Sequence, residues 1–587
     1  MKKKRIYFFS GMVLFIMIGL LVRMVQIQLL EAESFSRHQV NLIENSVNQR
    51  TQQLIIDEGR GTFLDRDGES INYETKNVLV LFPFLARIEW DVQKVADILH
   101  TNEKNLQRDI EEAKEPFVYG GKTPYILSET QMNEINNLQL KGVFALKRKY
   151  PKEEILAEQL IGLTGENEDR FHARYPDRVK GATQKIGITG LEKSFDEWLI
   201  AEQESKLIYH VDARGGPLFG VDVKYLAPAN PFYPLDIQTT IDSGLQMKME
   251  ELVDQHAIKR GGAVLLDIES GDILASVSRP YVQQGAPFSD EGAKNLMTSQ
   301  LVPGSVFKTV VASAAIDLNL VDENDLFNCD ETIYGKPAPK PHGTININES
   351  FAVSCNRTFA DIAKKLIEKD DTSLDRYAER LGLIGELGWK GTVFHYENFE
   401  QLPIDSGRIF ISDEERKEAN YVAQTGIGQR EVRVTPLGVA NMMATIARGG
   451  KKQSVRAVSG IHYKNGTELV DFPVQKADEQ AISPYTAMKM QQYLRNVVAG
   501  ESGTAKFLKT AAYEIAGKTG TAQTGQYKGE ADLYNKWFAG YFPFDRPKFA
   551  LAVVNMDVLE YEGGVYPIFK DIADMLHTSS ETKEVSQ

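Results

Sequence analysis

A serine and a lysine three residues apart open an apolar stretch, 302–318, with the sequence VPGSVFKTVVASAAIDL. Pro303 and Gly304 indicate a turn, and the run after them predicts a buried helix. Positions i and i+3 share one helix face, so the Lys308 amine can reach the Ser305 hydroxyl. Burial disfavours the charged amine, which makes Lys308 a candidate base and Ser305 a candidate nucleophile for acyl transfer. The alternative is a serine cap followed by a solvated lysine.

Two further stretches carry polar groups suited to the same chemistry. The sequence SFAVSCNRTFADIAKKL places Ser354 and Asn356 two residues apart in an apolar helix or at its entry, where both can point into one cleft. The sequence IAGKTGTAQTG supplies Lys518 and Thr519. Gly520 follows them, and its missing side chain leaves room for a ligand against the backbone. The alternatives are an ordinary polar pair and a glycine-rich turn.

Context decides whether such short motifs have meaning. Ser580 and Lys583 repeat the first spacing, but they lie in a polar C-terminal segment, where nothing would desolvate the lysine. The glycine-rich stretch also lacks the G-x-x-x-x-G-K-[ST] spacing of a phosphate-binding loop. The burial of Lys308 in an apolar run is therefore the feature that favours chemistry at the first motif.

The segments around these motifs predict the elements that position them. Residues 263–278 predict a hairpin around a Ser-Gly turn, and KWFAGYFP and FALAVVNMDV near the other end predict further strands. Most segments between them predict helices. Strands at both ends with helices between them are typical of one α+β domain, over 236–576, whose sheet is closed by both ends of its sequence. The lysine–threonine–glycine stretch would lie on an edge of that sheet.

The N-terminus predicts a membrane anchor. Basic residues at 1–5 precede an uncharged apolar run, and Arg23 can extend its charge to the membrane surface, so 6–30 predicts the anchor and the start of a stalk. Positive charge before the span indicates that 1–5 is a cytoplasmic tail. The alternative is a cleaved signal peptide, although the nearest small-residue pattern, at Ala32, lies well past the apolar run.

The rest of the chain divides at a proline-rich stretch, LAPANPFYPL, which predicts a linker between two domains. Residues 31–230 form the first domain in this interpretation, and 577–587 predict a disordered tail. The formal net charge of −14 and the lack of a basic stripe beyond the N-terminus argue against a nucleic-acid partner.

In the order S-x-x-K, S-x-N, K-T-G, the three motifs form the set found in penicillin-binding proteins and class A β-lactamases. The chain resembles a class B penicillin-binding protein, a peptidoglycan D,D-transpeptidase. Similar segments run from the anchor to about Phe569 and include RGTFLDRDG, LQLKGVFALKRKYP, GITGLEKSFDEWL, IQTTIDSGLQ, TGIGQREVRVTPLGVANMMATIARGG and KWFAGYFP. The resemblance implies an N-terminal transmembrane helix, an elongated α+β pedestal of the dimerisation type, and a transpeptidase domain whose central antiparallel sheet is covered by helices.

The resemblance also implies catalytic roles. Ser305 would attack the penultimate D-Ala carbonyl of a stem pentapeptide, with Lys308 as its general base. Ser354 would relay protons to the leaving amine. The backbone N–H groups of Ser305 and Thr521 would form the oxyanion hole.

The substrate-binding roles follow from the same resemblance. Asn356 would hold the peptide amide of the substrate. Lys518 and Thr519 would supply the electrostatic environment and bind the terminal carboxylate, beside Gly520, and Thr521 would line the same carboxylate site. No metal or organic cofactor is expected, and the nine histidines form no metal-binding motif.

The implied partners are peptidoglycan stem peptides as donor and amine acceptor, β-lactams as covalent inhibitors, the membrane, and cell-wall synthesis proteins. The implied location is the bacterial cell membrane, with a single span and an extracytoplasmic catalytic domain. Alternatives are a β-lactamase-like enzyme or a D,D-carboxypeptidase with the same acyl-enzyme, or a largely scaffolding cell-wall protein.

Only two cysteines occur in the chain, Cys329 and Cys355. In an oxidising compartment they can pair, and the alternative is two separate buried thiols. Because Cys355 lies inside the S-x-N motif, a disulfide would constrain the cleft and place it under redox control.

Overall fold

The computed structural model describes residues 2–37, 40–176, 185–200, 204–212, 223–226, 230–283 and 285–585. The chain forms two compact units whose segments alternate along the sequence. Unit 1 comprises Met1–Arg60, Tyr73–Pro151 and Ala201–Pro231, and unit 2 comprises Gly61–Asn72, Lys152–Ile200 and Phe232–Gln587. The sequence predicts a linear division near residue 230. In the structure, two earlier segments instead pack with the unit that carries the three motifs.

Unit 1 begins with the apolar helix that the sequence predicts. Helix α1 (Lys2–Val25) continues into a π-helical turn, Gln26–Leu30, and their side chains are largely exposed. The segment Lys3–Leu30 has a mean hydropathy of 2.3 and is long enough to cross a membrane. The stalk predicted after it is helical only over α2 (Leu42–Arg50).

Two three-stranded sheets form the rest of unit 1. Their strand orders are β1 (Thr51–Asp57), β8 (Ser205–His210), β9 (Lys224–Leu226), and β4 (Phe117–Val118), β3 (Tyr73–Leu81), β5 (Val143–Pro151). The remaining helices are η2 (Pro83–Arg87), α3 (Val92–Ile98), α4 (Glu103–Glu112) and α5 (Glu129–Asn137). Helix α5 begins with a capping box, in which Ser128 and Gln131 bond each other's backbone N–H.

Unit 2 is built on a five-stranded antiparallel sheet. Its order is β12 (Ile273–Arg279), β11 (Gly261–Asp267), β23 (Phe549–Val558), β22 (Ala531–Phe542), β21 (Ala516–Lys528). The first hairpin therefore pairs with the last strands of the region, as the sequence predicts. Strands β11 and β12 are buried along nearly their whole length, which explains their continuous apolar runs. Strand β21 lies at the edge, so part of its backbone remains open to a ligand.

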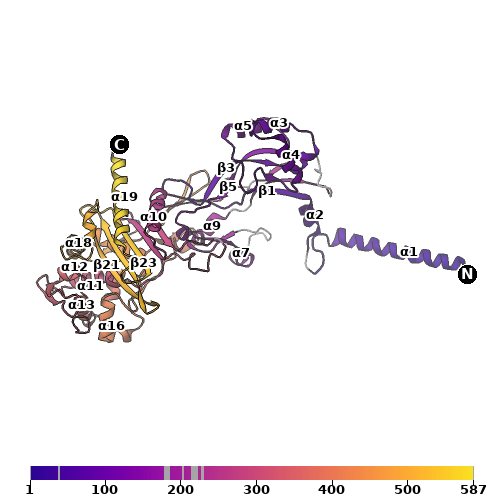
Figure 1. Cartoon of the computed structure of the whole chain (residues 1–587). Coiled ribbons are helices and arrows are strands. Elements are labelled where there is room, and N and C mark those ends of the chain that lie inside the picture. Colours follow the sequence, from indigo (N-terminus) through magenta and orange to yellow (C-terminus); the bar gives the residue numbers. More distant parts are fainter. Residues whose placement is uncertain are drawn as a thin grey trace. The chain divides into compact units, whose positions relative to one another are not determined.

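Helices cover this sheet, some in contact with its strands and others packed on those helices or on one another. The helices concerned are α10 (Ser243–Gln255), α11 (Lys308–Asp317), α12 (Ile347–Ala352), α13 (Asn356–Lys369), α17 (Pro436–Ala447), α18 (Pro484–Ala499) and α19 (Tyr566–Val585). Helices α10 and α19 contact each other and the sheet, whereas α17 packs on the central strands and α18 on β21. Figure 1 shows α11, α13 and α18 on one side of β21 and β23, and α10 on the other. Helix α11 is buried from Lys308 to Ile316, as its apolar sequence predicts.

Smaller elements complete unit 2. A four-stranded sheet has the order β19 (Glu468–Asp471), β18 (Val458–His462), β10 (Asp236–Thr239), β2 (Phe63–Leu64). Two-stranded pairs are β6 (Thr164–Glu166) with β7 (Lys185–Gly187), β13 (Leu326–Asn328) with β14 (Thr344–Asn346), β15 (Lys390–Val393) with β16 (Tyr396–Glu400), and β17 (Lys451–Gln453) with β20 (Lys476–Gln480). The short helices are α6 (Glu158–Ile161), α7 (Glu168–Arg174), α8 (Gly190–Ser194), α9 (Asp196–Leu199), η3 (Gly304–Phe307), α14 (Ser373–Arg380), α15 (Asp413–Lys417), α16 (Ala419–Gly426) and η4 (Lys506–Thr510).

The C-terminal segment differs from the prediction. The sequence predicts a disordered tail over 577–587, but α19 continues to Val585. The Ser580 hydroxyl donates to the backbone oxygen of Leu576, 2.9 Å away, and accepts from the hydroxyl of Tyr513 at 3.2 Å. These contacts come from residues distant in the sequence or from the helix itself, so the polar composition of the tail does not reveal them.

Candidate active site

Ser305 lies in the 3₁₀ turn η3, directly before α11. Gly304 has a φ of +57°, and a Cβ there would lie 2.4 Å from the backbone oxygen of Thr521. Glycine is therefore required both by the left-handed backbone and by the close approach of β21. The Trp537 indole N–H donates to the backbone oxygen of Val302 at 3.0 Å and fixes the approach to the turn. The predicted serine thus follows a turn, but it begins a 3₁₀ segment rather than an α-helix.

The S-x-N motif joins α12 to α13. Ser354 has a φ of +60°, a left-handed conformation that is strained for a residue with a side chain and that often marks functional sites. The Cys355 N–H donates to the backbone oxygen of Ser350 at 2.8 Å. Asn356 is the first residue of α13. The motif therefore lies at a helix entry, one of the two positions that the sequence allows.

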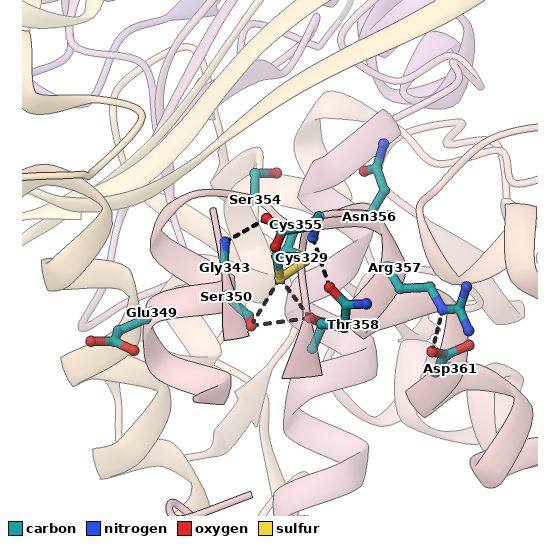
Figure 2. The surroundings of a disulfide bond; sticks show 12 residues. Cys329, Gly343, Glu349, Ser350, Ser354, Cys355, Asn356, Arg357, Thr358 and Asp361 are labelled. Atoms are coloured by element: carbon teal, nitrogen blue, oxygen red, sulfur yellow. Dashed lines mark hydrogen bonds and ion pairs between the residues drawn. A yellow bond between two sulfur atoms is a disulfide. The ribbon is translucent and has the colours of Figure 1, made fainter. Parts of the chain in front are cut away.

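Cys329 and Cys355 form a disulfide, with Cα atoms 5.9 Å apart. This resolves the choice that the sequence leaves open. Figure 2 shows the bond beneath the S-x-N motif, with Ser354 and Asn356 on either side of Cys355. The Cys329 sulfur also lies 3.4 Å from the Thr358 hydroxyl on α13. The disulfide therefore ties the segment after β13 to the entry of α13.

The K-T-G motif lies on the edge strand β21. Lys518 is fully buried and Thr519 nearly so, whereas Thr521 is exposed. A Cβ at Gly520 would lie 2.7 Å from the backbone oxygen of Pro303, so only glycine lets this strand lie against the turn of the first motif. The structure therefore brings the S-x-x-K and K-T-G motifs into direct contact.

A network of hydrogen bonds joins the motifs. The Lys308 Nζ donates to Asn356 Oδ1 at 2.6 Å, to the backbone oxygen of Ser354 at 2.7 Å and to Ser354 Oγ at 3.2 Å. The Lys518 Nζ donates to the same Ser354 Oγ at 3.0 Å and to Thr519 Oγ1 at 3.2 Å. The Ser354 hydroxyl therefore accepts from both lysines, and its own proton remains available to a third group.

The predicted contact between Ser305 and Lys308 is not a hydrogen bond in this structure. Among the described residues, no hydrogen bond joins Ser305 Oγ to Lys308 Nζ, because the amine is directed to the S-x-N motif. Hydrogen bonds of catalytic groups are often long in unliganded enzymes and tighten when substrate binds. Ser305 is partly exposed, so its hydroxyl is open to a ligand.

Both lysines have lowered pKa values. Burial, with the charge of Lys518 as a second cause, holds the pKa of Lys308 well below its ordinary value. Burial lowers the pKa of Lys518 to about 7. Neither amine forms an ion pair with a carboxylate in the described part of the chain, so no opposite charge offsets the cost of burying the ammonium group. Burial therefore favours the neutral form of both amines relative to an exposed lysine.

A groove of about 880 Å³ opens beside this network. Ser354 and Asn356 line it from the S-x-N motif, and the segment Cys329–His342 contributes much of another wall. Arg430 and Arg433 line it from the loop after α16. No role was predicted for these two arginines from the sequence. They lie in a segment used only for its resemblance, and the only signal was two basic residues close together.

Two families of known proteins match the chain. The penicillin binding protein transpeptidase domain matches residues 261–574, more than half of the chain. The penicillin-binding protein dimerisation domain matches residues 55–227. The chain therefore belongs to the penicillin-binding protein transpeptidase family, and the combination of the two domains confirms the predicted class B penicillin-binding protein.

Curated relatives and solved structures agree with this assignment. The peptidoglycan D,D-transpeptidase MrdA of Acinetobacter baumannii is 24% identical over 94% of this chain and 84% of its own. The peptidoglycan D,D-transpeptidase FtsI of Escherichia coli is 25% identical over 74% and 68%. A chain of a peptidoglycan synthase complex has a TM-score of 0.64 at 22% identity and covers 97% of both chains. Penicillin-binding protein 2X of Streptococcus thermophilus has a TM-score of 0.65 at 18% identity over 90% and 80%. The two structural likenesses show a shared fold.

Proposed function

We propose that this chain is a membrane-anchored peptidoglycan D,D-transpeptidase that cross-links stem peptides through an acyl-enzyme on Ser305. The observation that carries the proposal is the hydrogen-bond network in which Lys308 and Lys518 share the hydroxyl of Ser354 beside the Ser305 turn. A partly exposed serine, a buried base and a proton relay are the groups that acyl transfer to serine requires.

In the first half-reaction, the Ser305 hydroxyl attacks the carbonyl of the penultimate D-Ala and passes its proton to the neutral Lys308 amine. Burial lowers the pKa of that amine and so favours the neutral form, which can accept the proton. The backbone N–H groups of Ser305 and Thr521 stabilise the oxyanion. The carbon–nitrogen bond then breaks, and the leaving amine of the terminal D-Ala takes a proton through the Ser354 hydroxyl.

In the second half-reaction, the amine of a neighbouring stem peptide attacks the ester on Ser305. The amine loses its proton through the same Ser354 relay, and Lys308 returns a proton to the serine oxygen. A new amide bond forms and the enzyme is regenerated, so the reaction needs no cofactor. A β-lactam enters the first step only, because its opened ring stays attached to Ser305.

The substrate lies along the edge strand β21 in this proposal. Its terminal carboxylate binds at Lys518, Thr519 and Thr521 on the exposed edge, and a bound carboxylate favours the charged form of the Lys518 amine. Gly520 keeps the strand close to η3, the turn that carries Ser305 and is called the nucleophile turn below. The Asn356 side chain, which accepts from Lys308 through its Oδ1, has an amide nitrogen left to hold the peptide carbonyl.

The proposed location is the bacterial cell membrane. Helix α1 forms a single span, with the basic residues at 2–5 in the cytoplasm and unit 2 outside the cell. The N-terminal region corresponds to the pedestal, 31–230, and the transpeptidase region to 236–576. Cell-wall synthesis proteins are the proposed partners, since one structure of similar fold comes from a peptidoglycan synthase complex.

The test uses a synthetic donor peptide that ends in D-Ala-D-Ala, together with an amine acceptor. We expect release of D-Ala and formation of the cross-linked peptide, with both lost in Ser305→Ala. Ser580→Ala is the matched control, because Ser580 begins the other S-x-x-K sequence and its hydroxyl bonds Leu576 of its own helix and Tyr513 in the described chain. Release of D-Ala with hydrolysed donor as the sole product would identify a carboxypeptidase instead.

A further inference from the structure

The loop after α16 runs beside the nucleophile turn. The N–H of Leu301 donates to the backbone oxygen of Val434 at 2.8 Å, and the N–H of Val434 donates back at 2.9 Å. The Gly304 N–H donates to the backbone oxygen of Gly428, also 2.9 Å away. Residues 428–434 are therefore fixed to the segment that presents Ser305. Arg430 and Arg433 lie within this fixed stretch and line the groove.

Arg433 is a half-buried cation without a carboxylate partner in the described chain. Its Nη1 donates to the backbone oxygens of Arg430 and Val432, the latter at 3.0 Å. The neighbouring acid, Glu431, instead accepts from Arg408 at 3.1 Å. Burial lowers the pKa of the Arg433 guanidinium, because burying its charge is energetically unfavourable. The remaining N–H groups of the guanidinium have no hydrogen bond among the described residues.

Arg430 is held by stacking instead of by an ion pair. Its guanidinium carbon lies 3.5 Å from the ring centroid of Tyr421, and no hydrogen bond or ion pair of its side chain occurs in the described chain. A guanidinium stacked on a ring leaves its edge free to donate two parallel hydrogen bonds to a planar carboxylate. The backbone φ of Arg430 is +58°, so the loop adopts an unfavourable conformation at this position.

The carboxylates that line the groove do not pair with these arginines in the described structure. Glu331 lines the groove but accepts from Arg357 at 3.1 Å. Glu560 also lines it, and neither carboxylate pairs with Arg430 or Arg433 in the described structure. Positive charge is therefore in excess where the groove meets the loop after α16.

The groove extends along β21 beyond the K-T-G motif, where the donor peptide would lie in the proposed function. Besides Ser354 and Asn356, it is lined by residues 523–525 of β21, which lie beyond the K-T-G motif along the strand. A donor peptide with its terminal carboxylate at the motif would extend its preceding residues along this part of the edge strand.

We propose that Arg430 and Arg433 bind a second carboxylate of the donor stem peptide, carried by the side chain of the residue that precedes D-Ala-D-Ala. This inference rests on the proposed function, because it assigns a substrate preference to the same site. The two arginines are specificity residues in this proposal: they position the donor and take no part in the proton transfers. Charge-assisted hydrogen bonds of this kind change the ratio of kcat/KM between two donors by about 10- to 100-fold.

The test compares two synthetic donors that end in D-Ala-D-Ala and differ at one group. The preceding residue carries a side-chain carboxylate in one donor and the corresponding carboxamide in the other. For the wild-type full-length protein, we expect kcat/KM for D-Ala release to favour the carboxylate donor about 10- to 100-fold. The preference should arise mainly in KM and should weaken as salt is added.

The variant Arg430→Gln/Arg433→Gln should lose this preference and turn over both donors alike. Arg376→Gln is the matched control, because Arg376 pairs with Asp370 and does not line the groove. We expect the control to keep the full preference. A wild-type enzyme that does not distinguish the donors, or a folded double variant that keeps the preference, would overturn the inference.

Failure of the proposed function gives a different result. A wild-type protein that penicillin does not acylate and that releases D-Ala from neither donor contradicts the proposed function itself. A wild-type protein that is acylated and turns over both donors equally contradicts only the role of the two arginines. The wild-type ratio remains a test even if the double variant does not fold.

Discussion

At the scale of single residues, the Ser354 hydroxyl is the point where the two buried lysines meet. It accepts from Lys308 at 3.2 Å and from Lys518 at 3.0 Å, so both amines act on the same oxygen. In the proposed mechanism Lys308 works as the neutral base, whereas Lys518 works as a cation. The two lysines therefore require opposite protonation states at the same pH.

This difference predicts a bell-shaped pH profile for acylation by penicillin. The rate should rise with pH as Lys308 loses its proton, and burial moves that rise well below the ordinary pKa of a lysine. It should fall as Lys518 loses its charge, around its pKa of about 7. Lys518→Arg keeps the charge at all these pH values and should remove the falling limb. The measurement is the second-order rate of acylation against pH, and an unchanged falling limb in a folded Lys518→Arg protein would contradict the assignment.

The chemistry of single residues could be predicted from the sequence more fully than their contacts. The apolar run after Lys308 predicts its burial, and the structure confirms it. The amine nevertheless bonds Ser354 and Asn356 instead of Ser305, because the geometry depends on a segment 46 or more positions away. The roles proposed for these residues stay predictions until acylation is measured.

At the scale of elements, the nucleophile turn and the strand β21 approach each other so closely that a methyl group would not fit. A Cβ at Gly520 would lie 2.7 Å from the backbone oxygen of Pro303 and 2.9 Å from Val306 Cγ2. We expect Gly520→Ala to lower the free energy of unfolding by about 1–3 kcal/mol and to slow acylation, because the strand must move away from Ser305. Thermal unfolding and penicillin labelling measure both effects.

The control for this prediction is Gly564→Ala. Nothing lies within 4 Å of a Cβ built at Gly564, so this variant should unfold and acylate like the wild type. If Gly520→Ala behaved like Gly564→Ala, the contact between β21 and the turn would not be as close as described.

The disulfide gives a second prediction at this scale. Cys329 and Cys355 are separated by 26 positions, and closing a loop of this length stabilises a fold by about 3.5 kcal/mol in the chain-entropy account. Reduction should therefore lower the unfolding temperature. It should also slow acylation, because Cys355 adjoins Ser354, whose hydroxyl accepts from both lysines.

Rates of penicillin labelling with and without reductant measure the effect on acylation. The variant Cys329→Ser/Cys355→Ser is the control and should not respond to reductant. Equal labelling rates for oxidised and reduced wild type would show that the disulfide does not hold the site. In that case the redox control considered from the sequence would be excluded.

Elements with strong local patterns could be predicted, and those set by distant contacts could not. The hairpin over 263–278 and the edge position of β21 match the structure. The apolar pattern over 187–200 is typical of one amphipathic helix, but the structure has two short helices that meet at Phe195. A periodic apolar pattern does not show this break, because Phe195 packs against rings of Phe399 and Phe472 far along the chain.

At the scale of the whole molecule, the chain crosses between its two units several times. Segments 61–72 and 152–200 belong to the unit of the active site, although the sequence places them before the linker. In unit 1, β1 pairs with β8 through residues such as Thr51 and His210. Such pairing between distant segments leaves no local pattern, which explains why a linear division was predicted.

The apolar helix gives a prediction about the intact protein. Removal of residues 1–30 should release the protein from the membrane fraction, because Lys3–Leu30 is the one span of sufficient length and apolar character in the described chain. Penicillin labelling should persist, since the core of unit 2 contains no residue of this helix. Fractionation followed by labelling measures both. A truncated protein that stays with the membrane would show that another surface binds it.

The proposed acyl-enzyme mechanism depends most on which residue is acylated. The direct measurement is mass spectrometry of the penicillin-treated full-length protein, with the adduct located in its peptides, for wild type, Ser305→Ala and Ser580→Ala. We expect one adduct on the peptide that contains Ser305, its absence from Ser305→Ala and its persistence in Ser580→Ala. An adduct on any other residue, or label retained in Ser305→Ala, would contradict the proposed mechanism.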